Sequence, residues 1–453
     1  MTAADRAATQ VATGPVTVAP GDEPSAAATR TPWWRRRGRA ASDAPTGPEG
    51  AVGEETAGTT PNGAGVEPGA EGGPQATVMT NPEAVSMLFM GEGAPHEPGA
   101  VPHVGLRAGE VLVRIELATV CGSDVHTVLG HRTEPTPLVL GHEAVGHVVT
   151  VGGGGARYTD GGAVTAGDRV VWSVAVHCGN CDRCLRGIPQ KCQTLKKYGH
   201  ERIEHGWELS GGFASHIHLL AGTPLVRVDE RVPAQVLAPA GCGIATAWAA
   251  LAAAERTVPV HGARVLITGG GLIGLAAAAM AAERGAHVTL SDLDAERRSL
   301  AYEFGAAQAH DPAGEAELAE EFDIAIDASG APAAVASGLE ALSIGGVAVW
   351  VGSVFPTKPI KIVPERVVRG LITVTGVHNY TPVDLEGAVA FLHEQWQRYP
   401  FAGLVGETLP LHHLDLALER AAQHLEVRVG IDTQAPAPRD PALGTATSPI
   451  QTA

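Results

Sequence analysis

The chain has 453 residues, a formal net charge of −17 and a hydrophobic content of 44%. This length suggests two or more domains, and the hydrophobic content is that of an ordinary globular protein. The acidic balance argues against a nucleic-acid-binding surface, and no apolar run reaches the roughly 18 residues of a membrane-spanning helix. We therefore expect neither nucleic acid nor a membrane as a partner.

The two ends of the chain have a composition typical of disorder. Residues 1–76 are rich in Ala, Gly, Pro and Thr, as are residues 434–453. Such segments bury too little apolar surface to offset the entropy lost on ordering. One hypothesis is that Met79 is the native start. The basic cluster Trp33–Arg39 is interpreted as solvated, with targeting or binding of nucleic acid or membrane as the weaker alternatives.

Residues 84–230 are predicted to form many short strands. Residues 84–90 are a plausible first strand, residues 110–117 alternate between apolar and polar with period two, and residues 146–151 end in a run of glycines. Alternation of this kind is typical of half-buried strands. We expect a β-rich domain here.

From Cys242 onward the pattern changes to alternating helices and strands. The segment from Cys242 to Glu255 is Ala-rich and helical. Strands are predicted at 264–268, 287–290, 323–327 and 347–352, with helices beginning at Gly274 and Ala295 and, later, at 384–398 and 411–424. Strands that alternate with helices predict a parallel, doubly wound α/β sheet.

A glycine-rich turn follows the strand at 264–268. Gly269, Gly271 and Gly274 form a G-x-G-x-x-G that opens an Ala-rich helix, whose N-terminus would face a pyrophosphate together with Leu272 and Ile273. Asp292 lies where an acid accepts hydrogen bonds from ribose hydroxyls and repels a 2′-phosphate. This favours NAD. Arg297 and Arg298 keep NADP open as the alternative, and a glycine-rich turn without a ligand is the other.

Four of the six cysteines lie in one short run. Cys178, Cys181, Cys184 and Cys192 have the spacing C-x2-C-x2-C-x7-C, which lets four thiolates converge on one ion. Four thiolates leave no open position, so this predicts a structural zinc site, with disulfides as the alternative. Reduced cysteines used for metal favour a cytoplasmic location over a secreted one.

The other two cysteines belong to separate polar motifs. These are Cys121-Gly-Ser-Asp-Val-His126, Gly141-His142-Glu143 and Gly241-Cys242-Gly243. Two thiolates, one imidazole and an open position suit a zinc ion that binds an alcohol or carbonyl oxygen as a Lewis acid. Each motif alone is ambiguous, because a single His or Cys is more often a buried core residue.

Together these motifs resemble the zinc-dependent medium-chain alcohol dehydrogenase family over residues 84–432. The resemblance implies a GroES-like catalytic domain (77–242 plus 378–433) interrupted by a Rossmann-fold NAD-binding domain (243–377). It implies that Cys121, His142 and Cys242 bind the catalytic zinc and that Glu143 approaches the metal. Asp124 would orient His142. Ser123 would take the alcohol proton, which reaches solvent through the cofactor ribose and His126.

The resemblance also implies cofactor contacts and a class of substrate. Arg297 would neighbour the adenosine ribose and Arg428 would reach the pyrophosphate, whereas Gly122 replaces an Arg of the liver-type enzymes. Within the family, residues 172–175, 195–201, 209–213 and 376–382 resemble phosphonate-catabolism-associated and cyclitol dehydrogenases. Lys196, Lys197 and His200 would then supply positive charge that binds the substrate. The alternative is that they lie on the surface without a role in binding.

We therefore expect an enzyme of EC class 1.1.1.- with two Zn²⁺ per chain. It would transfer hydride between a primary or secondary alcohol (a polyol, cyclitol or phosphonate-type compound) and NAD. An NADP-dependent or zinc-free reductase of the same superfamily is the alternative. The expected partner is a small-molecule alcohol or carbonyl, and family members are commonly dimers or tetramers, so we expect a homo-oligomer.

Overall fold

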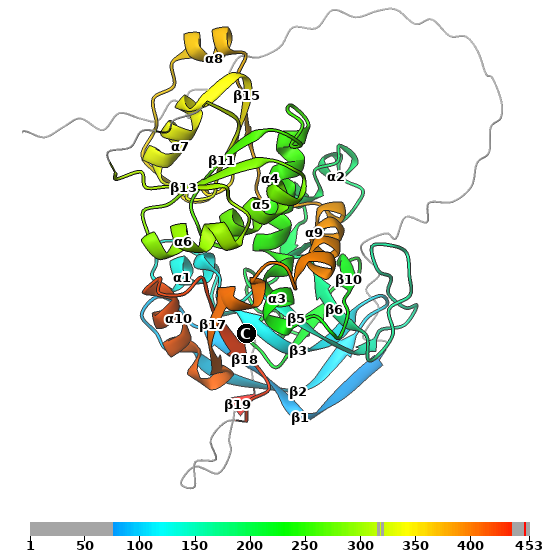
Figure 1. The fold of residues 1–453 in the computed structure, drawn as a ribbon. Coiled ribbons are helices and arrows are strands. Elements are labelled where there is room, and N and C mark those ends of the chain that lie inside the picture. Colours follow the sequence, from blue (N-terminus) through cyan, green and yellow to red (C-terminus); the bar gives the residue numbers. More distant parts are fainter. Residues whose placement is uncertain (1–75, 315–317, 319–320, 437–447, 450–453) are drawn as a thin grey trace, which may run out of the picture. The chain divides into compact units, whose positions relative to one another are not determined.

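The structure, a computed structural model, describes residues 76–314, 318, 321–436 and 448–449 (Figure 1). The segments 1–75 and 437–447, on which most of the predicted disorder falls, lie outside the described residues, as does the basic cluster Trp33–Arg39. Every predicted ligand of the two zinc sites lies within the described part.

The predicted doubly wound sheet is present. It has six parallel strands in the order β13-β12-β11-β14-β15-β16, so that the chain crosses over between β13 and β14 (Figure 1). Helices alternate with these strands along the chain, as the hydrophobic pattern predicted. The strands are β11 (Arg264–Thr268), β12 (His287–Ser291), β13 (Gln308–His310), β14 (Phe322–Asp327), β15 (Leu342–Trp350) and β16 (Thr373–Gly376).

The β-rich part contains a sheet in the order β10-β6-β5-β3-β18-β17, with β9 also paired to β3, a second sheet in the order β19-β2-β1-β4, and the pair β7-β8. The chain returns to the first sheet at its end, because β18 pairs antiparallel with β3. The strands are β1 (Ala76–Phe89), β2 (Glu97–Leu106), β3 (Val111–Thr119), β4 (Leu138–Val139), β5 (Glu143–Val151), β6 (Arg169–Trp172), β7 (Ala175–Val176), β8 (Lys196–Lys197), β9 (His216–Leu219), β10 (Leu225–Arg227), β17 (Val405–Pro410), β18 (Arg428–Asp432) and β19 (Ser448–Pro449).

The helices begin and end close to the predicted positions. The helix expected from Gly274 starts at Leu272 because Gly271 is its N-cap. The α-helices are α1 (Gly122–Val128), α2 (Asp182–Leu185), α3 (Ala234–Leu237), α4 (Gly243–Glu255), α5 (Leu272–Glu283), α6 (Ala295–Glu303), α7 (Pro332–Glu340), α8 (Pro364–Gly370), α9 (Pro382–Gln395) and α10 (Leu414–Ala422). Short 3-10 turns are η2 (Pro189–Lys191), η3 (Ala238–Gly241), η4 (Phe401–Leu404) and η5 (Leu411–His413).

A shared apolar core joins the start of the doubly wound sheet to the β-rich part. The Ala-rich helices α4 and α5 are almost entirely buried in it, together with Val171 of β6 and Ile267 of β11. Alanines allow backbones to approach closely, and close packing leaves little freedom for one element to move against another. The residue before α4 is Cys242, so this core fixes its position.

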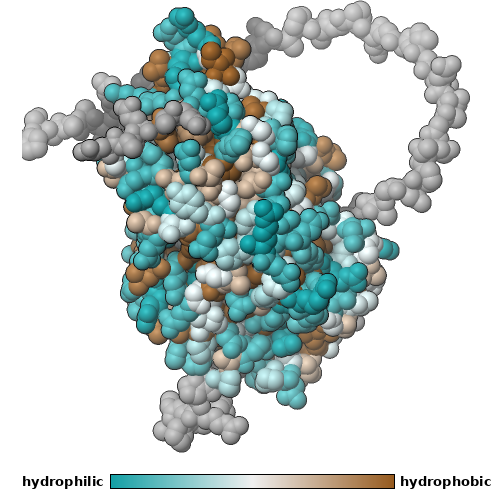
Figure 2. Space-filling model, in the orientation of Figure 1, coloured by the Kyte–Doolittle hydropathy of each residue, from teal (hydrophilic) through white to brown (hydrophobic). Residues whose placement is uncertain are grey.

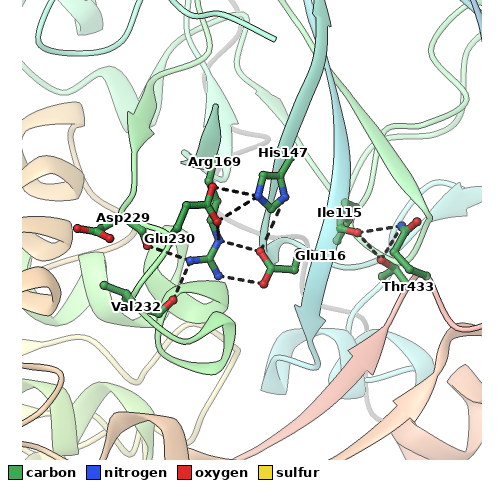
Figure 3. A network of polar contacts seen from close by, with 9 residues as sticks. Ile115, Glu116, His147, Arg169, Asp229, Glu230, Val232 and Thr433 are labelled. Atoms are coloured by element: carbon green, nitrogen blue, oxygen red, sulfur yellow. Dashed lines mark hydrogen bonds and ion pairs between the residues drawn. The ribbon is translucent and has the colours of Figure 1, made fainter. Parts of the chain in front are cut away.

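A buried arginine ties the strands of the larger β sheet to a loop. Arg169 on β6 is 3% exposed and donates to both carboxylate oxygens of Glu116 on β3, at 2.7 and 3.0 Å (Figure 3). It also donates to the carbonyls of Asp229 and Val232. Bidentate, charge-assisted bonds of this kind are strong and directional. They hold the strand whose end carries Cys121.

The face of the molecule in Figure 2 is largely hydrophilic, with apolar side chains gathered over α8 at the top of the view. In this helix and its flanks Val363, Val368 and Leu371 are 61–71% exposed. Among the described residues no single helix is long and apolar enough to cross a membrane, although the bent pair 234–241 and 243–255 meets the criteria of length and composition.

Candidate active site

One buried carboxylate organises the first two predicted ligands. Cys121 follows β3 and is the N-cap of α1. Asp124, 2% exposed, accepts from the N–H of Cys121 at 2.9 Å and from the N–H of Gly141 at 3.3 Å. The same carboxylate lies 3.4 Å from Nδ1 of His142. Asp124 therefore positions two loops that are distant in the sequence and leaves Nε2 as the nitrogen of His142 that can bind a metal.

The loop that carries His142 depends on a glycine. Gly141 has a φ of 90°, and a Cβ there would lie 2.8 Å from the backbone N of Phe213. Only glycine tolerates both the conformation and the close approach. His142 follows at once and is 4% exposed, with Nε2 3.3 Å from Oγ of Ser123.

Cys242 comes from the junction between η3 and α4. The hydroxyl of Tyr380 donates to the carbonyl of Gly241 and accepts from the N–H of Val174 at 3.0 Å. Tyr380 is buried and lies just after the sixth strand of the parallel sheet. It therefore anchors the loop of Cys242 from a part of the chain that the sequence motifs did not connect to it.

The three predicted ligands meet. Their ligand atoms, from Cys121, His142 and Cys242, all lie within 4.8 Å of one another. The hydrogen bond from Cys242 lowers the pKa of Cys121, burial opposes this, and the charge of Arg428 adds to the lowering. A thiol must lose its proton to bind metal. Two thiolates and one imidazole fit a zinc ion with one position open.

The four-cysteine run forms a second cluster. The Sγ atoms of Cys178, Cys181, Cys184 and Cys192 lie 3.4–4.0 Å apart in the four pairs that are in contact. With Zn–S bonds of about 2.3 Å, a tetrahedron has S···S edges of about 3.8 Å. All six cysteines are free of disulfides. The geometry fits a closed tetrathiolate zinc site and contradicts the disulfide alternative.

Glu143 and Arg428 form an ion pair behind the first cluster. Arg428 donates through Nε and Nη2 to the carboxylate of Glu143, at 2.8 and 3.0 Å, and the Glu143 side chain is fully buried. Nη2 of Arg428 also lies 3.8 Å from Sγ of Cys121. Burial raises the pKa of Glu143, and the charge of Arg428 opposes this. Arg428 was predicted to reach a pyrophosphate; its guanidinium is held by Glu143 at the wall of the cleft.

The glycine-rich turn and Asp292 lie together. A Cβ on Gly274 would lie 1.8 Å from the carbonyl O of Gly269, so α5 can pack against the turn only with glycine there. Asp292 follows β12, and its carboxylate accepts from the N–H of Gly270 at 2.6 Å. This places an acid beside the N-terminus of α5.

The two arginines after Asp292 differ. Arg298 is occupied, with an ion pair to Asp311 at 2.9 Å and hydrogen bonds to the carbonyls of Asp292 and Leu293. The Cβ of Arg297 would be 3.1 Å from a Cβ on Gly270, and its guanidinium makes one long contact, 3.5 Å, with the carbonyl of His424. Arg297 is therefore the arginine nearer the turn.

A cleft of about 690 Å³ joins the first cluster to the turn. The predicted residues that line it are Cys121, Gly122, Ser123, His126, His142, Lys197, His200, Cys242, Gly271, Leu272, Ile273 and Arg428. Burial lowers the pKa of His126, as does the neighbouring His131. Lys196 does not line the cleft, because neighbouring residues of a strand point to opposite sides; its ammonium pairs with Glu204 at 2.9 Å.

Sequence reasoning missed some of the lining. Arg132, Phe355 and His378 also face the cleft, and the ring of Phe355 lies 4.3 Å from that of His126. Of these three residues, only His378 could have been found from the sequence, because it lies in segment 376–382, which carried the family resemblance. Arg132 and Phe355 are in loops whose course the local pattern does not specify.

Comparisons with known proteins agree with this geometry. Residues 107–230 match the alcohol dehydrogenase GroES-like domain, and residues 273–394 match the zinc-binding dehydrogenase family. An L-threonine 3-dehydrogenase of Streptomyces coelicolor is 33% identical over 305 residues, covering 62% of this chain and 82% of the relative. That of Colwellia psychrerythraea is 29% identical over 327 residues, covering 68% and 86%.

Solved structures show the same architecture. An alcohol dehydrogenase from Thermotoga maritima has a TM-score of 0.73 at 29% identity, covering 77% of this chain and 99% of that chain. L-idonate 5-dehydrogenase from Escherichia coli has a TM-score of 0.66 at 22% identity, covering 79% and 99%, and shows the fold alone. The predicted combination of a GroES-like and a Rossmann-like fold is thus confirmed, and the chain belongs to the zinc-dependent medium-chain alcohol dehydrogenase family.

Proposed function

We propose that this protein is a zinc-dependent oxidoreductase that transfers hydride between a polar primary or secondary alcohol and NAD. One observation carries the proposal: Cys121, His142 and Cys242 meet in the cleft that also contains the start of α5. The curated relatives are named for oxidation of L-threonine, which is a small polar alcohol. Polyols, cyclitols and hydroxyalkyl phosphonates are the further candidates.

The residues of the site would have separate roles in metal binding and proton transfer. Zinc held by Cys121, His142 and Cys242 would supply Lewis-acid chemistry that lowers the pKa of a coordinated hydroxyl. Ser123 lies 3.3 Å from the ligand atom of His142, where its Oγ would accept the proton of the alcohol. His126, partly exposed in the same cleft, would release that proton to solvent.

The cofactor would lie between the glycine-rich turn and the cleft. The first N–H groups of α5 would face the pyrophosphate, with Leu272 and Ile273 along the cleft wall. Arg428 would contribute positive charge from the same wall. The carboxylate of Asp292, which accepts from Gly270, would exchange this bond for the ribose hydroxyls and oppose a 2′-phosphate.

The metal and the activity can be tested together. We expect purified protein to contain two zinc ions per chain and to reduce NAD in the presence of at least one compound from a panel of L-threonine, polyols, cyclitols and hydroxyalkyl phosphonates. One zinc ion, or none, with activity on quinones or enones would instead support the zinc-free reductase.

The choice of cofactor rests on one carboxylate. Asp292→Gly removes the charge that opposes a 2′-phosphate, and Arg297 beside the turn would then favour NADP. We expect the ratio of kcat/KM for NAD to that for NADP to fall by roughly 10- to 100-fold, which is about 1.4–2.7 kcal/mol. Asp294→Asn, in the N-cap of α6, is the matched control. Wild-type preference for NADPH would overturn the assignment of NAD.

Two further expectations belong to the proposal. Homologous dehydrogenases and the use of cysteines as metal ligands support a cytoplasmic enzyme. A dimer or tetramer is expected from the family, and sedimentation of the purified protein measures it directly.

A further inference from the structure

The cleft contains more basic groups than the proposed hydride transfer uses. Lys197 and Arg132 line it, and His378 joins them from the segment after β16. None of the three has a part in binding the metal, in the cofactor turn or in the proton path. The whole chain carries a net charge of −17, so these basic side chains have the opposite sign to the overall charge of the protein. Positive charge in a cleft raises the local concentration of anions.

Among the residues that the structure describes, Lys197 is a cation without a counter-ion. Its neighbour Lys196 forms ion pairs with Glu204 and Glu201, at 2.9 and 3.8 Å. Within the described residues the ammonium of Lys197 has neither a hydrogen bond nor an ion pair, whereas its backbone N–H donates to Glu201 at 3.0 Å and fixes the strand. The side chain is partly buried, and burial lowers its pKa, as does the charge of Arg132. An unpaired, desolvated charge is costly unless a ligand neutralises it.

The negative groups near Lys197 are already engaged. They include Glu134, Cys242 and Glu201. Glu201 accepts from the backbone N–H of Lys197 and is paired with Lys196. Glu134 is paired with Arg132, and Cys242 is assigned to the metal. The guanidinium of Arg132 retains N–H groups beyond those that Glu134 takes.

His378 adds a hydrogen-bond donor. Nζ of Lys191 lies 2.5 Å from Nδ1 of His378. An ammonium group can only donate, so Nδ1 is the acceptor and the neutral ring carries its proton on Nε2. Two cations and one N–H donor thus line one cavity with the proposed metal ligands.

We propose that the alcohol substrate carries an oxyanion group, a phosphonate, phosphate or carboxylate, and that Lys197, with Arg132 and His378, binds it. This inference rests on the proposed function and narrows it to anionic alcohols. Lys197 would be a specificity-determining residue, because a charged hydrogen bond to an ammonium is stronger than a neutral one. Neutral polyols and cyclitols would be poor substrates.

The test compares pairs of alcohols with the same skeleton, with and without the anion: 2-hydroxyethylphosphonate and its dimethyl ester, glycerol 3-phosphate and glycerol, 3-hydroxypropanoate and 1,3-propanediol. We expect kcat/KM to be at least about 10-fold higher for an anionic member, because a charged hydrogen bond contributes more to binding than a neutral one. The three pairs distinguish which oxyanion is preferred. Methylphosphonate should also inhibit competitively against the alcohol that is turned over. If none of the six is turned over, titration calorimetry of methylphosphonate with the zinc enzyme and NADH measures the same binding directly.

Variants assign the effect to one side chain. Lys197→Met should remove the preference and the inhibition by methylphosphonate, while Lys197→Arg retains most of both. Lys196→Met, which removes the neighbour that is paired with Glu204 outside the cleft, should change neither. The NADH affinity and zinc content of Lys197→Met should equal those of wild type, and its thermal unfolding temperature should be equal or higher, because the variant removes a desolvated charge.

Three outcomes would overturn the inference. They are a wild-type preference for neutral alcohols without inhibition by methylphosphonate, an equal loss on both members of a pair in Lys197→Met, and weakened NADH binding in that variant, which would make Lys197 a cofactor contact. Failure of the proposed function is distinguishable, because it would appear as absent zinc at the first cluster or absent binding of NADH in wild type.

Discussion

The two cysteine clusters are built in opposite ways. Cys178, Cys181, Cys184 and Cys192 come from one short loop with α2 and η2, and their sulfurs lie within 4.0 Å in the contacting pairs. Cys121, His142 and Cys242 come from three elements, and their ligand atoms lie within 4.8 Å. The four-cysteine cluster can bind metal as soon as the loop closes, because loop closure over few residues costs little entropy. The cluster of Cys121, His142 and Cys242 exists only after β3, β5 and α4 have packed.

The difference also concerns what surrounds the ligands. The cluster of Cys121, His142 and Cys242 opens to a cleft and has a positioning carboxylate, Asp124, and a buried ion pair, Glu143–Arg428, around it. Such partners fix the orientation and basicity of metal ligands. A site that must keep one position open cannot rely on four bonds to the metal to hold its geometry, so the protein supplies the rigidity. Substitutions in and around the two clusters should therefore have different consequences.

The largest effect is expected from removing a ligand of the open site. Cys242→Ala should reduce kcat/KM by more than about 1000-fold, since Lewis-acid stabilisation supplies several kcal/mol of the barrier. The zinc content should fall from two ions per chain to one, with the circular dichroism spectrum unchanged. Normal turnover in this variant would show that Cys242 is not a ligand.

Removing a ligand of the closed cluster should act on stability rather than on chemistry. Cys181→Ala should release the zinc of the four-cysteine cluster and lower the unfolding temperature by about 5–10 °C, because metal binding contributes directly to folding. Turnover per folded molecule should fall less than about 10-fold. If activity is lost while the unfolding temperature is unchanged, the division into structural and catalytic sites is wrong.

Breaking the ion pair behind the open site should cost more unfolding free energy when one partner is replaced than when both are. Arg428→Met leaves the buried carboxylate of Glu143 with the hydrogen bond from Thr119 at 2.7 Å but without a counter-charge, which should cost about 3–5 kcal/mol of unfolding free energy. The double variant Arg428→Met/Glu143→Gln should recover part of this. Arg420→Met, which removes a half-exposed partner of Glu407, should change stability by less than about 0.5 kcal/mol. Equal costs for Arg428→Met and the double variant would contradict the desolvation argument.

The smallest effect concerns the pH dependence of the strands that carry the open site. His216 lies on β9, which pairs with β3, and burial, together with the charge of Arg114, lowers its pKa from 6.5 to about 4. The folded state therefore favours neutral His216, and its contribution is complete above pH 6.5 and is lost as the pH falls towards 4. At pH 5 this loss is about 1–2 kcal/mol.

Urea unfolding at pH 7.5 and pH 5 measures this contribution. His216→Gln should show a smaller difference between the two pH values than wild type. His205→Gln, whose side chain is 93% exposed, should behave as wild type. An identical pH dependence in wild type and His216→Gln would refute the role of His216.

The sequence by itself determined the features that are local in the chain. The parallel sheet followed from alternating apolar periods, the glycine-rich turn from its spacing, and the tetrathiolate cluster from cysteines that a short loop must bring together. It also named Cys121, His142 and Cys242, but only the resemblance to a family grouped them, since residues 121 positions apart carry no local signal of contact.

Only the tertiary structure decided which side chains share a surface. It placed Lys197 in the cleft and Lys196 outside it, because successive residues of a strand face opposite sides. It brought Arg132 and His378 to the same cavity and held Arg428 on Glu143. Contacts of this kind depend on the packing of whole elements against one another, and that packing is fixed by a core drawn from many distant parts of the chain.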